Sequence, residues 1–79
     1  MKLNEAIAKR LGILMREHGL NQYQLFKASG VPQSTISTIL AVQNKTIKLD
    51  TIYDLCGGFK IELLEFFNSD IFNSNNIDD

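Results

Sequence analysis

The polar side chains of residues 33–38 are the part of this sequence whose types and spacing could do chemistry. In the stretch QSTISTIL, Ile36 and Ile39 are three positions apart, so a helix would place them on one face and the polar side chains on the other. The polar face is short and uncharged, and its amide and hydroxyl groups both donate and accept hydrogen bonds. Such a face could contact the edges of bases. Its candidate contact residues are Gln33, Ser34, Thr35 and Thr38.

Catalytic and metal chemistry have little support in the sequence. His18 is the only histidine and Cys56 the only cysteine, which excludes an internal disulfide and a Cys/His zinc site. The chain also has no phosphate-binding glycine loop and no constellation of carboxylates. We therefore expect no enzymatic activity, no metal and no cofactor.

The polar face needs a helix and a turn to position it, and the sequence signals both. Asn21 is a good N-cap, and Gln24, three residues later, can complete a capping box for a first short helix. Gly30 suits a turn that requires positive φ, and Pro32 has a φ suited to a first helical turn. Residues 22–41 therefore predict two short helices joined by a sharp turn, a helix-turn-helix.

Further helices are predicted on both sides of this motif. Apolar residues at helical spacing predict a first helix from Leu3 or Asn4 to His18. After a polar connection at 42–46, a helix is predicted from about Leu49 to Cys56, ended by Gly57 and Gly58. A last helix is predicted at about 61–67.

Length and composition indicate one all-α domain, at residues 3–72. Seventy-nine residues with 44% hydrophobic content can form one modest core, with no space for a separate effector-binding domain. The tail at 73–79 is expected to be disordered, although Ile71 and Phe72 before it could dock on the core. No apolar run is long enough to cross a bilayer or to act as a signal peptide, so the cytoplasm is the expected compartment.

Charge is unevenly distributed along the chain, although the formal net charge is only −1. Residues 1–48 hold seven Lys and Arg against two Glu, a net of +5, whereas residues 49–79 hold one Lys against seven acids, a net of −6. A protein with one face toward DNA would show this polarity, because phosphate attraction acts over roughly 8–10 Å and does not depend on total charge. Chance asymmetry in a small domain is the competing explanation.

The chain resembles the Cro and phage-repressor family of DNA-binding domains, the XRE-type regulators. The resemblance rests on Leu20-Asn21-Gln22, Leu25, Gly30-Val31 and Ile36, and extends from about Ile7 to Phe67. It implies a compact five-helix, lambda-repressor-like domain, with residues 33–40 as the recognition helix and double-stranded DNA as the partner. It also implies contacts to the DNA backbone, which we assign to Arg10, Gln22, Asn44, Lys45, Thr46 and Lys48.

The sequence departs from the family pattern at three places. Many members pair an arginine late in the first helix with a glutamate late in the recognition helix; here those positions are Met15 and Leu40, both apolar. Replacing a buried ion pair by packed hydrophobic residues is often neutral or stabilising. Phe26 stands where the family usually has alanine, so it either widens the space between the motif helices or turns outward. The usual glycine after the recognition helix is replaced by Ala41-Val42-Gln43.

Two functions from different classes fit these features. The first is a sequence-specific transcriptional regulator, a repressor of bacterial or phage origin that binds an inverted-repeat operator as a dimer, with no small-molecule effector evident. The alternative is a protein-interaction module, antitoxin- or antirepressor-like, that uses the same fold without reading DNA. The apolar C-terminal residues could form the dimer interface or close the monomer core; they are Leu64, Phe66, Phe67, Ile71 and Phe72.

Overall fold

Five α-helices and one short 3-10 helix make up the computed structural model, which describes residues 1–78 and contains no strand in that range. The prediction of an all-α fold is therefore confirmed. The helices are α1 (Leu3–His18), α2 (Gln22–Ser29), α3 (Gln33–Leu40), α4 (Leu49–Phe59), α5 (Leu63–Phe67) and η1 (Asp70–Phe72).

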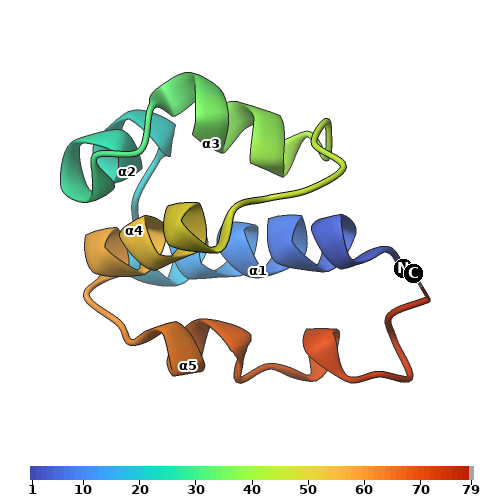
Figure 1. Ribbon diagram of the computed structural model, residues 1–79. Helices are drawn as coiled ribbons and strands as arrows, with labels where there is room; N and C mark the ends of the chain where they lie inside the picture. Colours follow the sequence, from blue (N-terminus) through green and yellow to red (C-terminus); the bar gives the residue numbers. More distant parts are fainter. Residues whose placement is uncertain (79) are drawn as a thin grey trace.

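The helices form three levels in Figure 1, with α2 and α3 at the top, α1 and α4 in the middle, and α5 and η1 at the bottom. The helices α3 and α5 therefore lie on opposite sides of the α1–α4 level. None of the helices in residues 1–78 is long and apolar enough to span a lipid bilayer.

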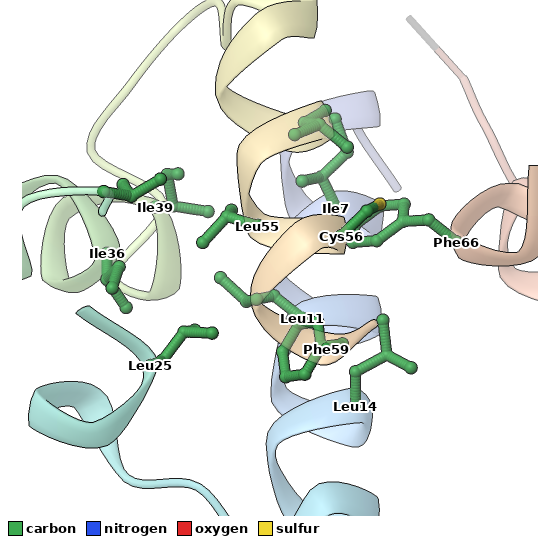
Figure 2. Close-up of a cluster of buried hydrophobic side chains, with 12 residues drawn as sticks. Ile7, Leu11, Leu14, Leu25, Ile36, Ile39, Leu55, Cys56, Phe59 and Phe66 are labelled. Atoms are coloured by element: carbon green, nitrogen blue, oxygen red, sulfur yellow. The ribbon is translucent and has the colours of Figure 1, made fainter. Parts of the chain in front are cut away.

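The core runs through all three levels. Figure 2 shows Leu25, Ile36 and Ile39 on one side of it and Phe66 on the other, with α4 and α1 between them. Leu25, Ile36 and Phe66 are 0% exposed. Burying a large apolar side chain contributes about 1.5–3 kcal/mol, so these residues fix α2, α3 and α5 against the middle level.

The helix ends of the motif follow the predicted local signals. The Oδ1 of Asn21 accepts a hydrogen bond from the Gln24 amide at 2.8 Å, and the Oε1 of Gln24 accepts one from the Asn21 amide at 2.9 Å. This confirms the predicted capping box. Gly30 has a φ of 78°, as its turn requires, and α3 begins one residue after Pro32.

The predicted end of α4 is wrong, because Gly57 and Gly58 lie inside the helix. It continues to Phe59, which is 3% exposed, and ends where Lys60 adopts a φ of 59°. The Ile61 amide then donates to the Cys56 carbonyl at 3.0 Å, as part of the C-terminal cap. Ile61 is thus occupied in ending α4, which delays the start of α5 to Leu63.

The C-terminal segment packs more fully than its composition suggests. Phe72 docks as predicted, with its ring centroid 5.0 Å from that of Phe67. Disorder was expected from residue 73; in the structure a bend at Asn73 leads into a turn at residues 74–76, where the N-terminal ammonium donates to the Asn76 carbonyl at 2.8 Å. Polar contacts rather than apolar burial hold this segment, and hydrophobicity patterns do not reveal such contacts. Residue 79, the end of the predicted tail, lies outside the described residues.

Candidate DNA-binding surface

The turn between α2 and α3 sets the orientation of the recognition helix. Val31 is 4% exposed and its amide donates to the Ser29 Oγ at 3.1 Å, so the turn is anchored by both an apolar and a polar contact. Leu25 and Ile36 join the two helices through the core. These contacts hold α3 with its polar face outward.

The polar face of α3 is accessible along its first turn. Gln33 and Ser34 are exposed, whereas Thr35 and Thr38 are half-buried. The Thr38 hydroxyl donates to the Ser34 carbonyl at 2.7 Å, so its proton is used within the helix. Gln33 and Ser34 thus offer the freest hydrogen-bonding groups, while Thr38 offers mainly its methyl group and its oxygen as an acceptor.

The loop between α3 and α4 lies beside this face. Thr35 and the loop residues Asn44, Thr46 and Lys48 line one hollow of about 320 Å³. Lys45, Thr46 and Lys48 are exposed and Asn44 is half-buried. The structure therefore brings together one predicted base-contacting residue and three of the four predicted backbone-contacting residues of the loop, whereas Lys45 lines a neighbouring hollow beside Asn4 of α1.

Asn4 is a residue that the sequence analysis missed. Its Nδ2 donates to the Asn44 carbonyl at 2.6 Å, so the first turn of α1 supports the loop. The two residues are 40 positions apart, and a lone asparagine early in a helix carries no signal of this contact. Only the three-dimensional structure could identify it.

Val42 occupies the place where the family usually has glycine, and its φ is 56°. This is the left-handed region, which a β-branched residue rarely adopts. The Val42 amide donates to the Ile39 carbonyl and the Gln43 amide to the Thr38 carbonyl, so α3 ends in the geometry of a glycine cap without the glycine.

Arg10, predicted to hold a phosphate from the first helix, forms its hydrogen bonds inside the domain. Its Nε donates to the Phe66 carbonyl at 2.7 Å and its Nη2 to the Glu65 carbonyl at 2.8 Å. The guanidinium therefore satisfies the last carbonyls of α5, on the side of the molecule away from α3 (Figure 1). We remove Arg10 from the set of residues proposed to contact the DNA backbone.

Gln22 remains suitably placed for a phosphate. It is half-buried at the first position of α2, where amide groups of the helix N-terminus have no partner within the helix. A phosphate at that point would meet both the side-chain amide and the positive end of the helix dipole.

The departures from the family pattern are absorbed by packing. Met15 and Leu40 both pack on the core and both line one shallow apolar groove, so hydrophobic contact occupies the region where other members place charges. Phe26 is half-buried against the core, with its ring 6.2 Å from that of Tyr23. It neither lies fully inside nor turns fully outward.

The two candidates for other chemistry also have structural roles. Burial raises the pKa of the Cys56 thiol above its ordinary value, which keeps the thiol protonated and unreactive. The His18 Nδ1 lies 2.9 Å from the Leu14 carbonyl, and its ring centroid is 5.0 Å from that of Phe59. Both residues stabilise the packing of α1 and α4.

The C-terminal residues predicted for a dimer interface divide between core and surface. Phe66 is fully buried and closes the monomer core, so it cannot contact a partner. Phe67 and Phe72 are half-buried and pack on the same core, and Ile71 is half-buried. Leu64 alone of the five is widely exposed, at 82%.

Comparison with known families agrees with this geometry. A family model described as a Cro/C1-type HTH DNA-binding domain matches residues 10–68, which span the second half of α1 and all of α2 to α5. No curated protein and no solved structure matches the chain. The family match confirms the resemblance that the motif residues indicated. The chain therefore belongs to the Cro/C1-type family of helix-turn-helix DNA-binding domains, and its general function is that of a DNA-binding regulator.

Proposed function

We propose that this protein is a transcriptional repressor that binds an inverted-repeat operator as a dimer, with α3 in the major groove. The exposed, uncharged first turn of α3 is the observation that carries the proposal. Gln33 and Ser34 present hydrogen-bonding groups there, and α3 contains no charged residue. A surface made for phosphates alone would instead be rich in Lys and Arg.

Each predicted residue then has a defined role. The Gln33 amide pairs with the N6 and N7 edge of an adenine, and the methyl groups of Thr35 and Thr38 contact thymine methyls. We therefore expect an operator that contains A/T pairs. Phosphate contacts fix the register and come from Gln22, Asn44, Lys45, Thr46 and Lys48.

A dimer follows from the small number of bases that one α3 can read. Specific affinity in helix-turn-helix proteins normally needs two half-sites about 34 Å apart, one turn of the duplex. A dimer on such a site blocks polymerase by occupancy. The cytoplasm, where operator DNA is found in bacteria, is the proposed place of action.

Selection of bound sequences from random duplex DNA tests this proposal. The wild-type chain should enrich an inverted repeat, and a variant with Gln33, Ser34 and Thr35 changed to Ala should lose that motif while keeping its helical circular-dichroism signal. A matched control is Lys9→Ala, which changes an exposed residue outside the surface and should enrich the same motif. Enrichment of the same weak pool by the wild type and the triple variant would contradict base reading by α3.

The alternative function, a protein-interaction module, rests on aromatic residues that the core has largely taken up. Phe66 is fully buried, and Phe26, Phe67 and Phe72 are half-buried against the core. These residues offer a partner little apolar surface, and we do not propose this function.

A further inference from the structure

The position of the proposed dimer interface is constrained by the fold. Two copies that read one duplex must be related by a two-fold axis that leaves both copies of α3 on the same side. In Figure 1, α5 lies on the side opposite α3, so a dimer joined through the bottom of the molecule would direct the two recognition helices away from each other. The interface must therefore lie on a side wall, between the levels of α3 and α5.

The outer face of α4 forms such a wall and carries an unpartnered aromatic ring. Tyr53 is 62% exposed, and Leu49, one turn earlier, is 61% exposed. On its inner face α4 is buried by the core, so these two side chains have no role in closing the monomer. An exposed tyrosine beside an exposed leucine is typical of an interface centre.

One turn after Tyr53, the same face is hollow. Gly57 is exposed and a Cβ built on it would meet nothing within 4 Å. The hollow, of about 360 Å³, lies between α2, α4 and the start of α5, and is lined by Ala28, Ser29, Tyr53, Asp54, Cys56, Gly57, Ile61, Glu62 and Leu63. Tyr53 therefore borders a hollow that extends one helical turn along α4, to Gly57.

We propose that a second copy of this chain docks antiparallel along α4, with each Tyr53 entering the hollow over the partner's Gly57. A two-fold axis perpendicular to α4 generates this arrangement and keeps both copies of α3 on one side. The same register places Asp50 opposite Lys60, the residue that ends α4, so the two-fold relation creates two complementary charge pairs. The inference rests on the dimeric regulator proposed above and assigns its interface.

The surface of α5 offers less to a partner. Leu64 is its one widely exposed large hydrophobic residue, and Glu62 and Glu65 beside it are exposed acids. Repeated in a second copy, these acids would repel each other. The α4 wall combines two exposed apolar side chains, Leu49 and Tyr53, with a hollow beside them, which the α5 surface does not.

Substitution of Gly57 should change the dimer Kd without lowering the stability of the monomer, so it tests the interface separately from folding. Gly57→Gln fills the hollow with a side chain that has open space in the monomer and a better helix propensity than glycine. In sedimentation equilibrium, the wild-type chain should dimerise, and Gly57→Gln should raise the dimer Kd by at least about tenfold without lowering the Tm measured in dilute protein. Leu64→Ser is the matched control and should leave the dimer Kd unchanged.

Exchange of charges tests the register. Asp50→Lys alone and Lys60→Asp alone should each weaken the homodimer, because each places like charges opposite one another. An equimolar mixture of the two variants should form a heterodimer, since both charge pairs are then complementary. The same mixture in about 1 M salt should lose this advantage, because the Debye length falls to roughly 3 Å.

The outcomes distinguish the interface from the proposed function. A wild-type chain that stays monomeric in solution and on DNA, or a dimer that survives Gly57→Gln and yields to Leu64→Ser, would overturn the α4 interface. Loss of the dimer in Gly57→Gln together with recovery in the charge-swap mixture would establish it. The dimerisation measurements and the DNA selection test different claims. A chain that dimerises through α4 but enriches no DNA motif would contradict only the proposed function.

Discussion

Val42 holds the backbone after the recognition helix in a conformation that usually belongs to glycine. A φ of 56° costs an L-residue roughly 1–2 kcal/mol, and the branched Cβ of valine adds crowding. Lys60 has a similar φ of 59° at the end of α4, so this chain twice ends a helix in the left-handed region without glycine. The strain at Val42 lies in the loop that carries the proposed phosphate contacts.

Val42→Gly should therefore raise the free energy of unfolding, by about 0.5–1 kcal/mol. Removing the backbone strain stabilises the folded state by roughly 1–2 kcal/mol. The greater conformational entropy of glycine in the unfolded chain opposes this by only about 0.4–1 kcal/mol. Urea denaturation would measure the change. Ala41→Gly, at a residue with φ of −83°, removes no strain and should lose about 0.5–1 kcal/mol. Equal effects of the two variants would show that Val42 is unstrained.

Arg10 illustrates how one side chain can replace a local helix cap. α5 has only five residues, and its last carbonyls receive the Arg10 guanidinium from α1. The asparagine cap of α2 could be predicted because its partner lies three residues away, whereas the partners of Arg10 lie 55 and 56 residues away. The sequence places an arginine on a helix, but it does not reveal whether the guanidinium binds a DNA phosphate or a backbone carbonyl of the protein.

Arg10→Met should destabilise the fold without weakening DNA binding. Hydrogen bonds from a charged donor contribute about 1.5–3 kcal/mol to stability. Because Arg10 is only half-buried, water can replace part of this contribution, and the free energy of unfolding should fall by less than the full amount. Urea denaturation and DNA titration at two salt concentrations would measure both quantities. Arg16→Met, which changes an exposed arginine of the same helix, should affect stability by less than about 0.5 kcal/mol. A lower salt dependence in Arg10→Met would instead show that Arg10 contacts phosphate.

At the scale of elements, the two glycines of α4 have different roles. A Cβ on Gly58 would lie 2.8 Å from the Cβ of Ser29 and 3.2 Å from the Cδ1 of Leu25, whereas one on Gly57 would meet nothing within 4 Å. Gly58 is thus the point of close approach between α4 and α2. From sequence, a Gly-Gly pair predicts a helix end; the packing of α2 on α4 and the burial of Phe59 override that local preference.

Alanine substitutions at these two positions should therefore act in opposite directions. Gly58→Ala should lower the free energy of unfolding by about 1–3 kcal/mol, because α2 must move to admit the methyl group. Gly57→Ala should raise it by up to about 1 kcal/mol through helix propensity alone. Thermal unfolding of dilute protein would compare them. Stabilisation by both substitutions would show that α2 and α4 are not closely packed at Gly58.

The helices themselves were largely predictable, since their apolar spacing and local caps lie within a few residues. The end of α1 followed from Gly19, the two ends of α2 from Asn21 and Gly30, and the start of α3 from Pro32, whose signals are local. The recognition-helix candidates were likewise found from residue type and spacing. The end of α4, the support of the loop by Asn4 and the packing of residues 73–78 depend on contacts distant in sequence, which periodicity cannot encode.

At the scale of the whole molecule, the distribution of charge matters more than its sum. The predominantly basic first part of the chain supplies α2, α3 and the loop with Lys45 and Lys48, and the acidic second part supplies α4, with Asp50 and Asp54, as well as α5 and the C-terminal turns. Figure 1 places α3 and α5 on opposite sides, so α5, which carries Glu65, lies away from the proposed DNA surface. Because charges more than about 8–10 Å apart are screened at physiological salt, phosphates near α3 experience mainly the nearby lysines.

DNA affinity should therefore depend strongly on salt, although the chain has a net charge of −1. A plot of log K against log salt should be linear with a slope of roughly −0.9 for each phosphate neutralised. Lys45→Ala should reduce this slope by about 0.9 for each copy of the chain on the DNA, and should weaken binding to all sequences alike. Lys9→Ala changes the net charge equally but lies outside the proposed surface, and should leave the slope unchanged. If both variants changed the slope equally, affinity would follow the total charge of the molecule and the polarity would have no role in binding.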